Sequence, residues 1–182
     1  MRKLLLTLLC CVAWPSMAMN VVFDTNMGSF TVELNQEKAP ITVKNFLRYV
    51  EDGSYKGSQF HRVIPGFMAQ GGGFDADMQR LATYDPIHNE ASNGLKNNTA
   101  TIAMARLPEP HTASRQFFIN LQDNDFLNYS ARSDGYAVFG KVTQGFEVIQ
   151  AMAMAMQPTK RLGHMQDVPV SPIVIQQVTL QP

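Results

Sequence analysis

Residues 60–72, FHRVIPGFMAQGG, form the stretch that decides which fold this chain adopts. Two short runs of aromatic, branched and other apolar residues flank Pro65-Gly66, a pair typical of a chain reversal. Arg62 is the one charged side chain in the stretch. A buried arginine is costly unless fixed partners accept its hydrogen bonds. The stretch therefore predicts two strands joined at a turn, with an arginine held for a specific purpose.

Strand geometry predicts which of these side chains share a face. Because side chains alternate along an extended strand, Phe60, Arg62 and Ile64 are expected on one face. Beyond the turn, Met68 and Gln70 share a face. The guanidinium of Arg62, the amide of Gln70 and the thioether of Met68 can then converge on one surface with an apolar base. The stretch alone is equally compatible with an arginine at a barrel edge that pairs with a carboxylate.

The beginning of the chain has the form of an export signal. The basic pair Arg2-Lys3 precedes an apolar run over residues 4–13, which is too short to span a bilayer. Ser16 and Ala18 are small residues spaced like a leader-peptidase site. We expect a signal peptide that is cleaved after Ala18. The rival interpretation, a membrane anchor, is weaker because no other apolar run is long and uncharged enough to span a membrane.

Composition limits what the mature domain can do. Cys10 and Cys11 both lie within the predicted signal peptide, residues 1–18, so residues 19–182 offer no disulfide, thiol nucleophile or cysteine-ligated zinc site. Fifteen basic and fifteen acidic residues balance, so neither nucleic acid nor an anionic membrane is an expected partner. The four histidines lack the spacing of a metal site, and no G-x-S-x-G elbow is present. We expect one domain without metal or cofactor.

The remaining pattern is mainly that of strands. Eight segments are rich in branched and aromatic residues and are bounded by turn residues: 21–24, 29–34, 60–64, 67–70, 99–105, 116–121, 136–142 and 173–180. Apolar residues recur at helical spacing in residues 39–50 and 146–156. Eight short strands suggest a closed sheet, and two helices can cover the ends of a barrel.

Later blocks extend the opening stretch into a family resemblance. IAMAR at 102–106, SRQFFI at 114–119, FL at 126–127 and YAVFGKV at 136–142 follow FHRVIPGFMAQGG in order. The whole series resembles the cyclophilin family of peptidyl-prolyl cis-trans isomerases, most closely the periplasmic bacterial cyclophilins. The resemblance implies a mainly β fold, a closed eight-stranded antiparallel β-barrel capped by two α-helices. It also implies a location in the periplasm.

The same resemblance implies a set of site residues. Arg62 is expected to be the catalytic arginine, and Gln70 to orient its guanidinium and the substrate carbonyl. Arg106 stands where the family has an asparagine that binds substrate through its main chain, a contact that tolerates the exchange. An insertion around residues 107–111 leaves the alignment of residues 105–113 open. The expected substrate-binding residues are His61, Phe67, Met68, Arg106, Gln116, Phe118, Phe126, Leu127 and Tyr136.

Two of these residues depart from the family pattern. Phe126 replaces a tryptophan that many members carry, and Tyr136 replaces a histidine. Phenylalanine cannot donate the hydrogen bond of an indole N–H. We therefore expect weak binding of the family's cyclic peptide inhibitor, whereas turnover of prolyl peptides should survive.

Function follows from the resemblance, with alternatives. The expected activity is acceleration of Xaa-Pro bond rotation in unfolded or partly folded exported polypeptides, which assists their folding. A holdase that binds prolines without significant catalysis is the first alternative, and a structural barrel without ligand is the second. A monomer is expected, since no exposed apolar helix demands a partner.

Overall fold

The computed structural model describes residues 19–154, 159–162 and 165–181. The predicted signal peptide lies outside the described residues, as do the last residues of the helix predicted over 146–156. Within the described part, the structure is mainly β, with two α-helices and two short 3₁₀ segments.

Eight strands form one antiparallel sheet, in the order β10-β1-β2-β7-β5-β6-β4-β3. Each corresponds to one of the eight predicted segments, and sequential hairpins supply the β1–β2 and β3–β4 pairs. The strands are β1 (Met19–Thr25), β2 (Gly28–Leu34), β3 (Ser58–Ile64), β4 (Met68–Asp75), β5 (Thr101–Met104), β6 (Phe117–Asn120), β7 (Val138–Gln144) and β10 (Ile175–Gln181).

The barrel is less completely closed than predicted. The edge strands β3 and β10 are not joined by a ladder along their length. A single bridge links Gln59 to Val174, and the amide of Phe60 donates to the carbonyl of Ile173 at 2.9 Å. The sheet is therefore a curled half-barrel whose edges meet at one place.

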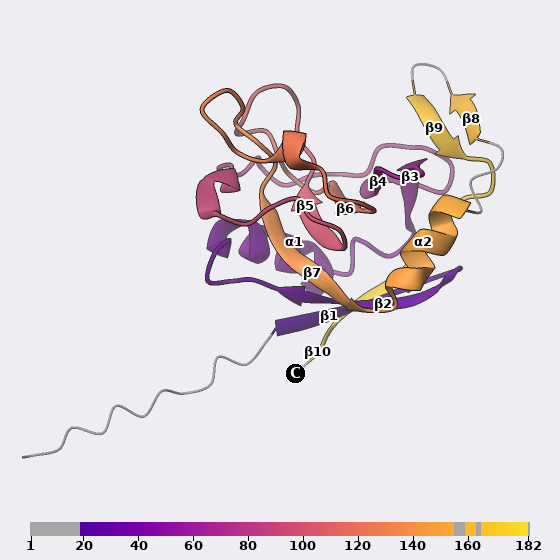
Figure 1. Ribbon diagram of the computed structural model, residues 1–182. Helices are drawn as coiled ribbons and strands as arrows, with labels where there is room; N and C mark the ends of the chain where they lie inside the picture. Colours follow the sequence, from indigo (N-terminus) through magenta and orange to yellow (C-terminus); the bar gives the residue numbers. More distant parts are fainter. Residues whose placement is uncertain (1–18, 155–158, 163–164, 182) are drawn as a thin grey trace, which may run out of the picture.

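Helices α1 (Pro40–Glu51) and α2 (Phe146–Met154) cover the barrel from different sides (Figure 1). Val43 and Phe46 of α1 and Ile149 and Met152 of α2 are completely buried in the same core. Pro40 suits the first turn of α1, where its missing N–H has no helical partner to lose. The two 3₁₀ segments are η1 (Ala91–Asn93) and η2 (Asp125–Leu127).

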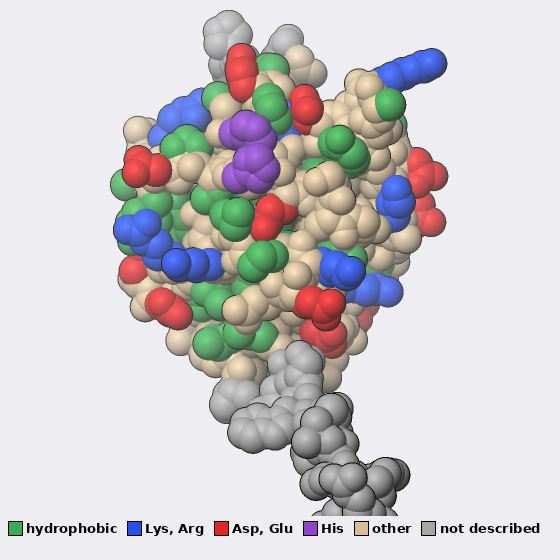
Figure 2. All heavy atoms as spheres, turned by 90° about the vertical axis from the view of Figure 1, so that its left-hand side faces the viewer, with side chains coloured by type: hydrophobic (Ala, Val, Ile, Leu, Met, Phe, Trp, Pro, Cys, Tyr) green, Lys and Arg blue, Asp and Glu red, His purple; other side chains and the backbone are tan. Residues whose placement is uncertain are grey.

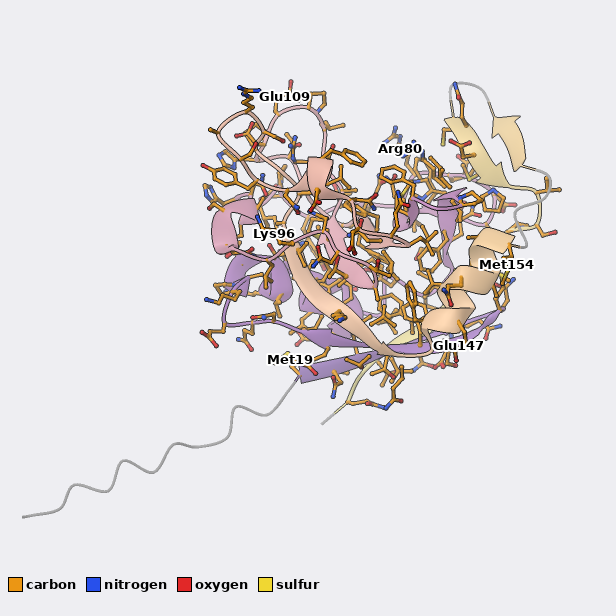
Figure 3. All side chains as sticks on the ribbon, viewed as in Figure 1. Met19, Arg80, Lys96, Glu109, Glu147 and Met154 are labelled. Atoms are coloured by element: carbon orange, nitrogen blue, oxygen red, sulfur yellow. The ribbon has the colours of Figure 1, made fainter. Side chains whose placement is uncertain are left out.

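Aromatic rings dominate the barrel interior. The rings of Phe23 and Phe30 stack at 4.7 Å, and those of Phe60 and Phe117 meet edge-on at 5.8 Å. Side chains from the sheet and both helices fill the space between the strands (Figure 3). Since interiors are packed as densely as organic crystals, this core leaves no room for substrate, and a site must lie on the outside.

One element was not predicted at all. After α2, strands β8 (Thr159–Leu162) and β9 (Met165–Pro169) pair as an antiparallel hairpin of their own. The hairpin stands apart from the main sheet at the upper right of Figure 1, and β9 contacts β3. It therefore lies against the strand that carries Arg62.

The surface carries both signs of charge. On the face shown in Figure 2, acidic and basic side chains alternate with apolar ones, and neither sign forms a large continuous patch. Among the described residues, no helix is long and apolar enough to cross a bilayer.

Candidate active site

A β-bulge in β3 places Arg62 on the outside of the barrel. Phe60 pairs with Gly71 and Arg62 with Gln70, so His61 is an extra residue opposite a single step of β4. The expected strict alternation is therefore wrong at this point, because Phe60 is completely buried in the barrel core. Bulges redirect side chains in this way beside functional sites.

A row of paired residues crosses four strands at the level of Arg62. Arg62 pairs with Gln70, Gln70 with Phe118, and Phe118 with Ala103. Directly opposed residues in adjacent strands point to the same face of a sheet. The arginine, the amide and the phenyl ring predicted to act together are thus neighbours on one outer surface.

An apolar cluster, here called the outer cluster, adjoins this row and is separate from the barrel core. Its buried members are Met68, Ala103, Phe118 and Val138. Partly buried side chains pack against them, namely Ile64, Phe67, Leu95, Ala105, Leu127 and Tyr136. Five of the expected substrate-binding residues therefore lie together there, namely Phe67, Met68, Phe118, Leu127 and Tyr136.

Aromatic contacts define the rim of the outer cluster. Tyr136 meets Phe118 edge-on, with ring centroids 5.7 Å apart. Phe126 stacks on Phe67 at 5.6 Å and is 68% exposed. Phe126 consequently forms part of the rim rather than the floor.

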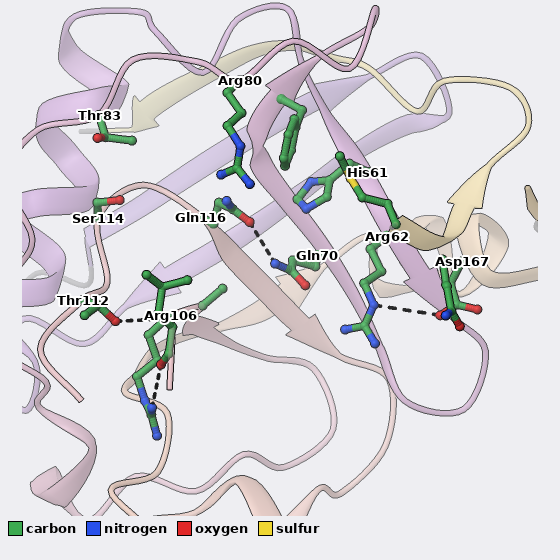
Figure 4. A pocket seen from close by; sticks show the side chains of 15 residues that line it. His61, Arg62, Gln70, Arg80, Thr83, Arg106, Thr112, Ser114, Gln116 and Asp167 are labelled. Atoms are coloured by element: carbon green, nitrogen blue, oxygen red, sulfur yellow. Dashed lines mark hydrogen bonds and ion pairs between the residues drawn. The ribbon is translucent and has the colours of Figure 1, made fainter. Parts of the chain in front are cut away.

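A hollow of about 640 Å³ lies on the other side of Arg62 and Gln70. Gln70 donates a hydrogen bond from its amide nitrogen to Gln116 Oε1 at 2.9 Å, and both line this hollow (Figure 4). The residues that line it do not include the core of the outer cluster. Arg62 and Gln70 therefore stand between an apolar surface and a polar one, where a peptide could pass from one to the other.

Arg106 also lines the hollow, and its guanidinium donates three hydrogen bonds to main-chain carbonyls. It donates to the carbonyls of Gly135 at 2.9 Å, Leu107 at 2.9 Å and Pro108 at 2.8 Å. It also lies over the Tyr136 ring at 4.5 Å. Through Nε and Nη1, Arg106 thus fastens the loop from 107 onward to the segment before β7.

His61 borders the hollow from within the protein. Its ring is 4% exposed and packs against Phe74 at 4.7 Å. Burial, which disfavours the imidazolium, lowers the pKa of His61 to about 4, and the nearby charges of Arg62 and Arg80 act in the same direction. Its Nδ1 is buried and has no hydrogen-bond partner among the described residues. His61 is therefore a neutral wall of the site near pH 7.

Three charged residues of the region escaped the sequence analysis. Asp167 of β9 lies 3.9 Å from Arg62, between Oδ2 and Nε, and Arg80 also lines the hollow. Arg115 is 2% exposed and donates to the carbonyls of Gly72, Ala82 and Ser54. No local pattern marks Asp167, and no helix or strand was predicted between residues 156 and 173. Arg115 belongs to the motif SRQFFI at 114–119, but no role was predicted for it.

Comparisons with known proteins agree with this geometry. The family model described as "Cyclophilin type peptidyl-prolyl cis-trans isomerase/CLD" matches residues 20–180. Peptidyl-prolyl cis-trans isomerase cyp18 of Streptomyces antibioticus is 52% identical over 86% of this chain and 95% of the relative. Peptidyl-prolyl cis-trans isomerase B of Escherichia coli K12 is 50% identical over 88% of this chain and 98% of the relative.

A solved structure shows the same fold. The cyclophilin-type isomerase cgd2_1660 of Cryptosporidium parvum, crystallised in the presence of the dipeptide Ala-Pro, matches with a TM-score of 0.69 and 28% identity. The match covers 90% of this chain and 99% of that one. The chain therefore belongs to the family of cyclophilin-type peptidyl-prolyl cis-trans isomerases, as its sequence motifs predict.

Proposed function

We propose that this protein accelerates cis–trans rotation of Xaa-Pro bonds in exported polypeptides and thereby assists their folding, with Arg62 as its catalytic residue. The observation that carries this proposal is the row Arg62–Gln70–Phe118 beside the outer cluster. It places a charged donor next to an apolar cluster on the outer face of the sheet. Family membership supports the reaction class.

The reaction needs electrostatic help rather than bond cleavage. Amide resonance opposes rotation with a barrier of roughly 18–20 kcal/mol, so the uncatalysed exchange takes tens to hundreds of seconds. At the twisted transition state the proline nitrogen regains its lone pair and can accept a hydrogen bond, which it scarcely does when planar. A donor directed at that nitrogen stabilises the transition state selectively.

Arg62 suits this task by chemistry and position. An arginine guanidinium offers rigid, planar donors, and the Arg62 side chain is 41% exposed, so substrate can reach it. In our proposal, Gln70 binds the substrate carbonyl while the amide of Gln116 fixes Gln70. Met68, Phe118 and the other outer-cluster side chains hold the proline ring.

The magnitudes require more than one contribution. A ten-thousandfold acceleration corresponds to about 5.5 kcal/mol, and one hydrogen bond to a charged group supplies about 1.5–3 kcal/mol. The remainder is assigned to fixing the proline ring while the preceding carbonyl swings. The structure of the Cryptosporidium relative in the presence of the dipeptide Ala-Pro supports a site that accepts proline.

Export to the periplasm is proposed from the sequence of residues 1–18. Its test is the N-terminus of protein recovered from a bacterial periplasm. Cleavage after Ala18 predicts that the mature chain starts at Met19. A periplasmic fraction that lacks the protein, or one whose protein starts at Met1, would contradict this part of the proposal.

The activity is tested by NMR exchange spectroscopy on a short prolyl peptide. Substoichiometric purified protein should produce cis–trans exchange cross-peaks within a mixing time of a second or less, where the free peptide shows none. Peptide line broadening without exchange cross-peaks would indicate binding alone, as in a holdase, and would refute the enzymatic proposal.

A further inference from the structure

The β8–β9 hairpin brings a carboxylate to the proposed catalytic arginine. Asp167 Oδ2 lies 3.9 Å from Arg62 Nε, and the two side chains are 37% and 41% exposed. Asp167 is the one acidic residue among the described residues that line the hollow, where Arg62, Arg80 and Arg106 are the basic ones. It faces Arg62 rather than the other two (Figure 4).

The backbone at Asp167 is unusual in a way that serves this contact. Its φ of 59° lies in the left-handed region, which few residues other than glycine adopt. In the β8–β9 ladder, Leu162 pairs with Met165 and Lys160 with Val168, so β9 carries an extra residue at this place. This bulge turns the Asp167 side chain toward β3.

The neighbouring residues keep the carboxylate in place. Val168, the next residue, is 1% exposed, and Pro169 after it is also buried. Because β9 is anchored there and contacts β3, Asp167 is positioned by packing rather than by its own ion pair. A strained conformation that the surroundings maintain is a feature found at functional sites.

We propose that Asp167 is a positioning residue for catalysis: it faces the Nε side of Arg62 and directs the terminal NH₂ groups toward the substrate. Figure 4 shows these terminal nitrogens turned away from Asp167. An exposed ion pair adds little to the stability of a fold, so stabilising the fold is not the main effect of this contact. Instead, Asp167 favours the Arg62 side-chain rotamer that orients the guanidinium in this way. This inference rests on the proposed role of Arg62.

The test compares the full chain with its Asp167→Asn variant. Asparagine tolerates a positive φ and has nearly the same shape, so the hairpin keeps its conformation and only the charge is lost. With a neutral prolyl peptide, kcat should fall about two- to fivefold at low salt, while KM stays unchanged, since the oriented donor acts in the transition state. Raising salt to about 1 M should lower wild-type kcat toward that of the variant.

A spectroscopic measurement tests the positioning separately from activity. The ¹⁵Nε–H signal of Arg62 should show a lower order parameter in Asp167→Asn than in the wild type. Glu51→Gln, which removes the same charge from an exposed site at the end of α1, is the matched control and should change neither kcat nor this signal.

Two outcomes would overturn the proposal. One is an Asp167→Asn variant with wild-type kcat and an unchanged Arg62 signal, and the other is a variant with raised kcat, which would make Asp167 a restraint on Arg62. Both leave an active wild type, so they are distinct from failure of the proposed function, in which the wild type itself shows no exchange.

Discussion

At the scale of single residues, Gly73 illustrates how close the site residues lie. A Cβ at this position would come within 2.5 Å of Cγ and Cδ of Gln116, the side chain that accepts the hydrogen bond from Gln70. Any side chain at residue 73 must therefore displace Gln116. The absence of a side chain at Gly73 is a condition for the Gln70–Gln116 contact.

Gly73→Ala should consequently lower kcat/KM. We expect a loss of about two- to tenfold, because Gln70 loses the acceptor that fixes it, worth about 0.5–1.5 kcal/mol. Exchange NMR on a prolyl peptide measures the effect. Gln116→Ala should cause a similar loss, and the double variant should be little worse than either single one. Full additivity of the two losses would show that Gly73 acts by another route.

A second prediction at the scale of single residues concerns Phe126 and inhibitor binding. Its ring is exposed and stacks on Phe67, so a larger aromatic ring can replace it without disturbing the core. Phe126→Trp supplies an N–H donor and should tighten binding of the family's cyclic peptide inhibitor by about two- to tenfold. Titration calorimetry tests this, with peptide turnover as the control that should stay within about twofold. Tight inhibitor binding by the wild type would contradict the role given to Phe126.

The sequence draws attention to Arg62 but does not reveal its surroundings. In the sequence, Arg62 lies among apolar residues. The bulge at His61 nevertheless turns the Arg62 side chain outward, where it is 41% exposed. Among the residues whose burial the structure describes, the buried arginine is Arg115. Alternation along a strand predicts faces only while the ladder is regular, and a bulge depends on the partner strand, which lies outside any local pattern.

At the scale of elements, Arg115 ties three segments together. It reaches the carbonyls of Ser54 after α1, Gly72 in β4 and Ala82 in the following loop, at 2.7, 2.6 and 2.6 Å. Buried main-chain carbonyls are costly to leave unpaired. Where these three segments meet, the guanidinium of Arg115 therefore supplies hydrogen bonds that a regular β-ladder would otherwise provide.

Arg115→Lys should destabilise the protein by about 2–4 kcal/mol. An ammonium cannot span the three carbonyls that the planar guanidinium reaches, so buried acceptors lose their partners. Urea denaturation followed by circular dichroism gives the change in unfolding free energy. Arg132→Lys, at an exposed position, is the matched control and should change it by less than about 0.5 kcal/mol. Equal stability of the two variants would refute the bridging role.

Prediction of the elements succeeded where the signal was local and failed elsewhere. All eight strands of the main sheet and the positions of α1 and α2 follow from apolar periodicity and turn residues. The β8–β9 hairpin does not, because TKRL and MQDVP carry mixed polar and charged residues and lack an alternating pattern. The pairing of β8 with β9 and the contact of β9 with β3 depend on tertiary structure, which no local sequence pattern reports. Asp167 was therefore not predicted as a site residue.

At the scale of the whole molecule, the packing of His61 links the site to stability. The pKa of His61 is lowered to about 4 because the ring is buried, whereas an exposed histidine in the unfolded chain titrates near its ordinary value. The folded state therefore favours the neutral form. This contribution to stability is complete above about pH 6.5 and is lost as the pH falls through about 4.

The unfolding free energy should thus decline as the pH is lowered from about 6.5 to 4, by roughly 3 kcal/mol from His61 alone. His61→Phe keeps a ring against Phe74 and removes the titration. Its urea-unfolding free energy, measured across the same pH range, should fall correspondingly less. Parallel pH profiles for the two proteins would show that His61 does not cause the decline.

In the molecule as a whole, one sheet separates two apolar clusters. The barrel core lies on the inside, and the outer cluster, which includes Met68 and Phe118, lies on the other face. Arg62 and Gln70 lie at the boundary between the outer cluster and the polar hollow. Substitutions at this boundary should therefore affect turnover much more than stability.

The most direct test of this account is the turnover of Arg62→Ala, measured by NMR exchange spectroscopy on a prolyl peptide. We expect kcat/KM to fall by more than about tenfold, while the melting temperature and the dispersed spectrum of the folded protein stay the same. Arg62→Lys should also be impaired, because an ammonium lacks the rigid planar donors. Wild-type turnover by a folded Arg62→Ala protein would contradict the central claim.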